Sequence, residues 1–150
     1  MRVLAGDIGG TKTLLQVAEY ADNRWHVIAN ARYENRDYFS FDALLENFCA
    51  AERTGCSGVD AVCLALAGPV SDGAVQLTNL PWSIDMEFLR RRLGVEHVRL
   101  INDMQGAGYG IASLERSDLL VLNAGERVGN GVCGLIGAGT GLGEAWMVWR

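Results

Sequence analysis

The stretch RVLAGDIGGTKTLLQVAEY, residues 2–20, decides the first part of the fold, because it reads as two strands joined by a glycine-rich turn. Residues 2–7 form a short apolar segment closed by glycine and aspartate, and residues 11–20 alternate apolar and polar side chains as a strand does. RWHVIANARYE, residues 24–34, continues this alternation. We therefore expect three meandering strands linked by hairpin-like turns.

The period of the apolar residues changes after this meander. From Ser40, a residue type that caps helices, apolar side chains recur at helical spacing through residues 41–48. The later segments predict, in order, a buried strand at 58–68, a short strand at 73–79, a helix at 83–94 with Ile84 on its apolar side, a buried strand at 97–103 and a helix at 104–114. This order is typical of an α/β fold in which helices cover a mixed sheet.

The pattern of apolar segments changes again near residue 113. DLLVLN (118–123), GVCGLIGAG (131–139) and LGEAWMVWR (142–150) read as three strands in quick succession, which would begin a second sheet like the first. We expect a small α/β domain at 1–112 and the incomplete start of a larger one at 113–150. A final strand with no partner beyond it would be an exposed edge, so we expect the first part of a longer protein or a chain that a partner completes.

Composition narrows the class of protein. A formal charge of −5 argues against a general nucleic-acid binder, which needs a basic face. The four cysteines form no C-x-x-C pair, so buried reduced thiols are the simplest interpretation. The first apolar segment is too short for a signal peptide, and no apolar run reaches the roughly 20 residues that span a bilayer. We expect a cytoplasmic protein with no membrane or nucleic-acid partner.

The turn GDIGGTKT, residues 6–13, allows two interpretations. It matches neither the P-loop nor the dinucleotide fingerprint, and adjacent glycines are common in ordinary hairpins. Converging backbone amides can nevertheless hold a phosphate, and Gly9 and Gly10 would let the backbone approach its oxygens. Thr11 could add a hydroxyl, and Asp7 could hold Mg²⁺ directly or through water.

Two further segments bear on that choice. GAGTGLG, residues 137–143, is a second glycine turn between predicted strands, with the Thr140 hydroxyl among its amides, and the two turns could grip one polyphosphate from opposite sides. Asn102 and Asp103 end a buried strand, where ligands of open α/β sheets gather. There Asp103 could accept the proton of an attacking hydroxyl, or it could cap the following helix; local sequence leaves both readings open.

Five ordered motifs resemble the bacterial glucokinases of the actin-like, ribonuclease H-like superfamily of ATP-dependent sugar kinases. The motifs are LAGDIGGTKT (4–13), LALAGPV (64–70), LTNLPWSI (77–84), LINDMQGAGYGI (100–111) and IGAGTGLGEA (136–145). The resemblance implies ATP-phosphate contacts at Gly6, Asp7, Ile8, Gly9, Gly10 and Thr11 and, from the second turn, at Gly139, Thr140 and Gly141. It also implies Asp103 as the catalytic base, Asn102 on the sugar, and Gly68 and Asn79 lining or supporting the sugar cleft.

The implied reaction is phosphorylation of glucose to glucose 6-phosphate by ATP and Mg²⁺. Two alternatives stay open: a non-catalytic sugar sensor on the same fold, and a kinase for another hexose. Lys12 stands where many relatives carry asparagine, so the resemblance assigns it no role. The family's further sugar ligands and its adenine pocket would lie beyond residue 150, so we expect these 150 residues alone to be inactive. A homodimer is a possible assembly of the protein.

Overall fold

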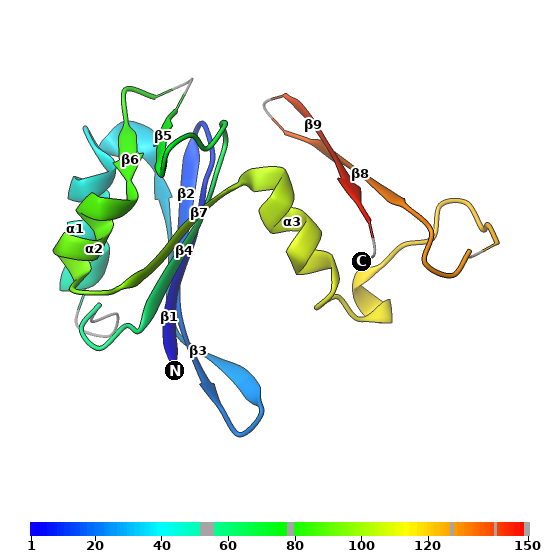
Figure 1. Ribbon diagram of the computed structural model, residues 1–150, viewed down its shortest axis with the longest axis horizontal. Helices are drawn as coiled ribbons and strands as arrows, with labels where there is room; N and C mark the ends of the chain where they lie inside the picture. Colours follow the sequence, from blue (N-terminus) through cyan, green and yellow to red (C-terminus); the bar gives the residue numbers. More distant parts are fainter. Residues whose placement is uncertain (52–55, 78–79, 127, 140, 149–150) are drawn as a thin grey trace. The chain divides into compact units, whose positions relative to one another are not determined.

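The computed structural model describes residues 1–51, 56–77, 80–126, 128–139 and 141–148 (Figure 1). The chain divides into two compact units, Met1–Asp103 and Met104–Arg150, and each is described by itself. A mixed sheet covered by helices makes the first unit, which confirms the predicted α/β class.

The sheet of the first unit has five strands in the order β3-β2-β1-β4-β7. The meander is antiparallel, as its alternating pattern predicted, whereas β1 pairs with β4 and β4 with β7 in parallel. These strands are β1 (Arg2–Ile8), β2 (Lys12–Ala21), β3 (Arg24–Glu34), β4 (Ala61–Leu66) and β7 (His97–Asn102). The three parallel strands therefore end at the same edge of the sheet, which becomes the site described below.

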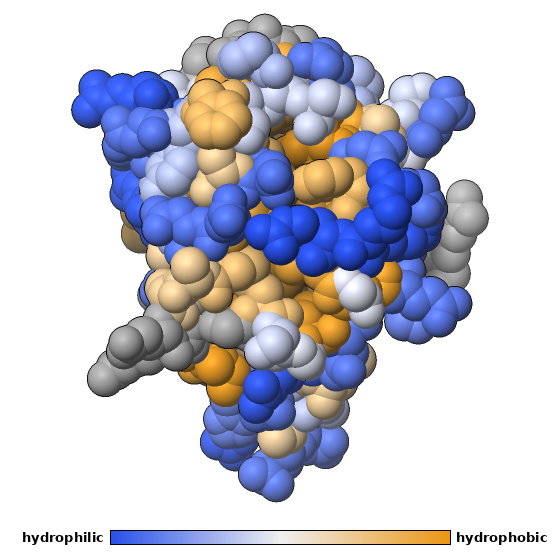
Figure 2. Space-filling view, turned by 90° about the vertical axis from the view of Figure 1, so that its left-hand side faces the viewer, coloured by the Kyte–Doolittle hydropathy of each residue, from blue (hydrophilic) through white to orange (hydrophobic). Residues whose placement is uncertain are grey.

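Two helices, α1 (Phe41–Ala50) and α2 (Met86–Leu93), cover one face of this sheet (Figure 1, left). Ser40 caps α1 as expected, since its Oγ accepts a hydrogen bond from the Ala43 amide at 3.2 Å. The core between helices and sheet is made of apolar side chains that alternate along the strands and recur along the helices: Leu4, Ile8, Leu15, Val17, Phe41, Leu44, Leu45, Phe48, Val62, Leu64, Leu66, Leu89, Val98 and Leu100. On the side of the molecule where α1 and α2 lie, hydrophilic side chains cover much of the surface, with hydrophobic surface visible between them (Figure 2).

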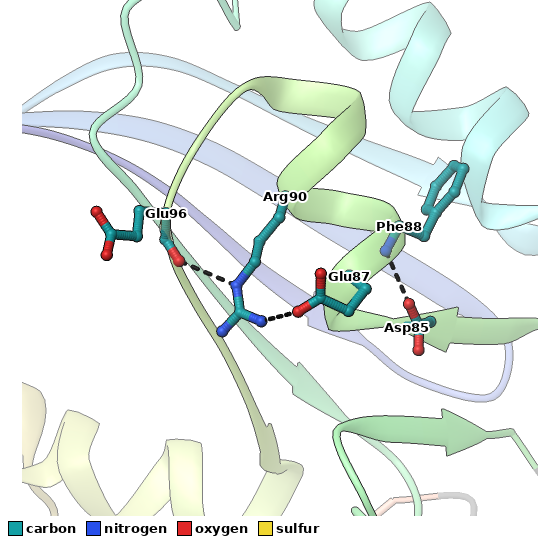
Figure 3. Close-up of polar contacts among 5 residues, drawn as sticks. All are labelled: Asp85, Glu87, Phe88, Arg90 and Glu96. Carbon is teal, nitrogen blue, oxygen red and sulfur yellow. Dashed lines mark hydrogen bonds and ion pairs between the residues drawn. The ribbon is translucent and has the colours of Figure 1, made fainter.

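A small two-stranded sheet precedes α2 and corrects one prediction. Ile84 lies in β6 (Ser83–Asp85), which pairs with β5 (Ala74–Gln76), and not on the helix. The helix begins only at Met86 because Asp85 Oδ1 accepts from the Phe88 amide at 2.7 Å, as an N-cap does (Figure 3). A short 3₁₀ turn, Asn35–Asp37, follows β3.

The end of α2 matches its sequence pattern. Gly94 terminates the helix in the left-handed conformation with φ of 66°, which glycine adopts without strain. Arg90 forms an ion pair with Glu87 and donates from Nε to the Glu96 carbonyl at 3.0 Å, so it ties the helix to the segment leading into β7 (Figure 3). The basic side chains in the last turn also favour the helix dipole.

The cysteines do not all follow the prediction of reduced, buried thiols. Cys49, near the end of α1, forms a disulfide with Cys56. Cys63 is free and half-buried, whereas Cys133 is free and exposed. The two bonded cysteines are seven residues apart, a spacing outside the C-x-x-C pattern, and the fold of the chain brings them together. Within the described residues, no helix is both long and apolar enough to cross a membrane.

The second unit contains α3 (Asp103–Ile111, from Met104 onward) and the hairpin of β8 (Cys133–Ala138) and β9 (Leu142–Met147). The strand predicted at 118–123 is absent: a 3₁₀ turn, Arg116–Asp118, is followed by an irregular segment. Its apolar side chains, Leu119 to Leu122, are all more than half exposed, so within the described structure they have no layer to pack against.

The hairpin packs on α3 through glycines. A Cβ on Gly143 would lie 2.5 Å from Met104 Sδ, and one on its register partner Gly137 would lie 3.2 Å from the same atom. Gly108 in the helix likewise lies against Met147. Most of α3 thus groups with the hairpin in the second unit. The proposed division into domains at 112/113 stays a prediction.

Candidate functional site

The carboxyl ends of β1, β4 and β7 meet at one edge of the first unit's sheet. Ile8, Leu66 and Asn102 are aligned across these three strands by the parallel register. Asp7 precedes Ile8 in β1, and Asp103 follows Asn102 at the start of α3. The predicted glycine turn, Asp7 and the Asn102–Asp103 pair are therefore parts of one sheet edge, where ligands of open α/β sheets bind.

The turn after β1 differs from an ordinary two-residue hairpin. The Gly9 N–H donates to the Lys12 carbonyl at 2.9 Å, and neither Gly9 nor Gly10 is among the described glycines with positive φ. A Cβ on Gly9 would lie 3.3 Å from the Lys12 carbonyl oxygen, so glycine is favoured there by close approach and not by φ. In the described part of the chain, the amides of Gly10 and Thr11 have no hydrogen-bond partner.

Two residues of the motif face the core instead of a ligand. A Cβ on Gly6 would lie 2.7 Å from Leu15 Cδ2 and 2.8 Å from Leu64 Cδ2, so glycine lets these leucines close over β1. The Ile8 side chain is fully buried. Any contact of Gly6 or Ile8 with a phosphate would come from backbone groups.

Asn35, which the sequence reasoning missed, is bonded to the turn from the end of β3. Its Nδ2 donates to the Gly9 carbonyl at 2.9 Å, its backbone N–H donates to the Thr11 carbonyl at 2.9 Å, and its Oδ1 accepts from the Thr13 hydroxyl at 2.8 Å. Asn35 and Thr13 are 1% and 0% exposed. In sequence, Asn35 falls in the polar stretch YENRD, which looks like an ordinary loop. Its role becomes visible only through its bond to Thr13, 22 residues earlier.

Asn102 is oriented by a neighbouring strand end. Its Nδ2 donates to the Gly68 carbonyl at 3.3 Å, just beyond the end of β4. Gly68 thus supports Asn102 through its backbone. The Ala67 N–H donates to the Ile8 carbonyl at 3.1 Å and joins the same strand end to β1. Asn79, also predicted to line or support the sugar cleft, lies outside the described residues.

Asp7 and Asp103 are coupled electrostatically. Partial desolvation raises the pKa of the Asp7 carboxyl above its ordinary 3.8, and the nearby Asp103 carboxylate raises it further. Asp103 is placed in the first turn of α3, where an acidic residue is favoured by the helix dipole. Asp7 in β1 and Asp103 after β7 thus lie near enough at this edge of the sheet for one carboxylate to disfavour ionisation of the other.

The second glycine turn belongs to the other unit. The Gly139 N–H donates to the Gly141 carbonyl at 2.9 Å, and Thr140 lies outside the described residues. The turn joins β8 to β9, as the sequence predicted. That the two turns hold one polyphosphate stays a prediction.

The described residues contain no cluster of three or more His, Cys, Asp or Glu side chains that could enclose a metal ion. Lys12 is exposed at the start of β2.

Comparison with known proteins identifies the family. The glucokinase family model matches residues 4–150, nearly the whole chain. The chain belongs to the glucokinase family. A glucokinase of Nostoc punctiforme is 40% identical over 147 residues, which cover 97% of this chain and 42% of that protein. The chain thus spans less than half the length of this glucokinase relative.

Solved glucokinase structures share the fold. A glucokinase from an Antarctic psychrotroph superposes with a TM-score of 0.80 at 26% identity, covering 98% of this chain and 46% of that one. A ROK-family glucokinase from Streptomyces griseus, in complex with glucose and AMPPNP, gives a TM-score of 0.64 at 24% identity and covers 99% and 45%. The mixed sheet of the first unit is accordingly of the ribonuclease H-like kind, as the motif resemblance implied.

Proposed function

We propose that the whole protein transfers the γ-phosphoryl group of ATP to the 6-hydroxyl of glucose, and that residues 1–103 supply the catalytic base and one phosphate turn. One observation carries the proposal: the edge where β1, β4 and β7 end brings the glycine turn together with the coupled carboxyl groups of Asp7 and Asp103. Membership of the glucokinase family supports the reaction type.

In this proposal Asp103 is the general base. Its carboxylate accepts the proton of the sugar 6-hydroxyl while that oxygen forms a bond to the γ-phosphorus. The bond between the γ-phosphorus and the β–γ bridging oxygen breaks, and ADP leaves with the bonding electrons. Asn102, held by the Gly68 carbonyl, orients the sugar beside Asp103.

The turn acts on the phosphates. In this proposal the Gly10 and Thr11 amides, which have no hydrogen-bond partner in the described part of the chain, donate to phosphate oxygens; such bonds are charge-assisted and stronger than neutral ones. Gly139, Thr140 and Gly141 are proposed as the second phosphate contact. Mg²⁺, when bound, neutralises phosphate charge, and Asp7 would hold it directly or through water.

The same proposal assigns residues 113–150 to the start of the larger domain and places the protein in the cytoplasm. Residues 1–150 by themselves are expected to show no turnover, because the family resemblance puts further sugar ligands and the adenine pocket beyond them.

The test is a coupled assay with ATP and a panel of hexoses on the full-length protein and on Asp103→Asn. General-base catalysis is typically worth about 10²–10⁴-fold, so the variant should lose that much kcat while glucose still binds in calorimetry. Asp22→Asn makes the same chemical change in the loop between β2 and β3, at the other end of these strands, and should keep the normal kcat.

The outcomes separate the alternatives. Glucose binding without turnover in the unmodified full-length protein would indicate the sugar sensor. Faster turnover with another hexose would keep the mechanism and change the substrate. A normal kcat in Asp103→Asn would remove Asp103 from the role of base.

A further inference from the structure

Asn35 and Thr13 are the two polar residues that the described structure buries in the core of the first unit, and they are bonded to each other. Burying such a pair where apolar side chains would pack is unfavourable unless every polar atom is bonded. The Gly9 carbonyl can only accept, so Nδ2 of Asn35 must face it, and Oδ1 is left for the Thr13 hydroxyl. The pair thus has a defined orientation with one donor directed at the turn.

That donor determines the direction of one peptide plane. The Gly9 carbonyl and the Gly10 N–H belong to the same peptide group, and in a trans peptide they point in opposite directions. Because Asn35 holds the carbonyl toward the core, the Gly10 N–H must point away from it. The Asn35 backbone N–H also donates to the Thr11 carbonyl, which holds a second peptide of the turn. Asn35 therefore holds both the Gly9–Gly10 and the Thr11–Lys12 peptides, and the unpaired Gly10 amide points away from it.

We propose that Asn35 is a positioning residue of the nucleotide site: it holds the Gly9–Gly10 peptide in the orientation that presents the Gly10 amide to a phosphate of ATP. This inference rests on the proposed function. It assigns Asn35 an effect on nucleotide affinity and none on the sugar, because its side chain bonds the turn and Thr13.

The decisive variant is Asn35→Asp in the full-length protein. It keeps the shape and the acceptor for Thr13, but it replaces the donor that faces the Gly9 carbonyl by an oxygen. Loss of one charge-assisted hydrogen bond to phosphate should raise the KM for ATP by about 10–100-fold. The KM for glucose should stay within about twofold. Asn30→Asp, at an exposed position of β3, is the matched control, and its KM values should equal those of the unmodified protein.

The pH dependence of the same variant gives a second readout. A buried carboxyl has a raised pKa, and once protonated it can donate to the Gly9 carbonyl again. The ratio of the KM for ATP of Asn35→Asp to that of the unmodified protein should therefore fall as the pH is lowered from 8 toward 6. If Asn35 only stabilised the fold, lowering the pH would not improve the KM for ATP while leaving the KM for glucose unchanged.

Thr13→Val keeps the test decisive if Asn35→Asp does not fold. It removes the hydroxyl that orients Asn35 while leaving the shape intact, so it should raise the KM for ATP by less than about 10-fold and leave that for glucose unchanged. An unchanged KM for ATP in a folded variant, or equal rises for ATP and glucose, overturns the inference. Absence of hexose phosphorylation in the unmodified full-length protein overturns the proposed function instead.

Discussion

The two glycine turns of this chain look alike in sequence and differ in how they are supported. The turn after β1 is held by a hydrogen bond from buried Asn35 to the Gly9 carbonyl, and it lies at the edge where three parallel strands end. The turn between β8 and β9 closes a hairpin whose flanking glycines, Gly137 and Gly143, make room for Met104. A glycine-rich motif therefore contains glycines of two kinds, and only their neighbours tell which ones serve packing and which ones expose amides.

The largest expected difference between the two turns is in how much stability is lost when a glycine that packs against other side chains, Gly6 or Gly143, is replaced by alanine. Gly6→Ala should lower the free energy of unfolding by about 1–3 kcal/mol, because its Cβ would meet two leucines that are fully packed in the core. Gly143→Ala should cost less than about 1 kcal/mol, because the atoms in its way belong to a flexible methionine side chain.

Denaturant unfolding of the full-length variants measures both effects. Gly110→Ala is the control, since nothing lies near its Cβ and alanine favours a helix. Equal losses at positions 6 and 143 would contradict the view that the first turn rests on a rigid core and the second on an adjustable contact.

A smaller effect is expected from Asp7, which distinguishes the first turn electrostatically. Since the fold raises its pKa above 3.8, the folded state holds the proton more tightly than the unfolded state does. The ionised carboxylate thus costs stability at neutral pH, and this cost disappears at a pH below 3.8, where both states are protonated. Asp7→Asn should raise the Tm at pH 7 by less than about 3 °C.

Thermal unfolding between pH 3 and pH 8 checks this prediction, with Asp22→Asn as the matched control. The gain from Asp7→Asn should fade as the pH falls toward the ordinary pKa of aspartate. A lower Tm of Asp7→Asn at pH 7 would show that the ionised Asp7 carboxylate stabilises the fold and would contradict this prediction.

Sequence reasoning was most successful where periodicity reflects burial. The meander, the two core helices and the buried strands follow from apolar residues spaced for one face, and Ser40 and Gly94 bound their helices as their chemistry predicts. It failed where apolar residues lack a neighbouring layer, as at Leu119 to Leu122, and where a cap sets the start of a helix, as Asp85 does after Ile84.

The candidate site residues stay a prediction, but some of them can be selected from local sequence alone. Asp103 and the glycine turn could be chosen as candidates because strand ends and short motifs are local signals. The roles of Gly6 and Asn35 could not, because they depend on contacts with residues far away in sequence: Leu64 lies 58 residues after Gly6, and Thr13 lies 22 before Asn35. The Cys49–Cys56 disulfide was missed for another reason: its spacing of seven residues matches no short cysteine motif.

The central claim is that the turn after β1 binds nucleotide phosphate through outward-facing amides. Backbone amide NMR of the full-length protein, titrated with AMPPNP and Mg²⁺ in the presence of glucose, tests it most directly. We predict large shifts of the Gly10 and Thr11 amide resonances, with the amides of Gly58 and Gly73 as internal references. Nucleotide binding that leaves the Gly10 and Thr11 resonances unmoved would contradict the claim.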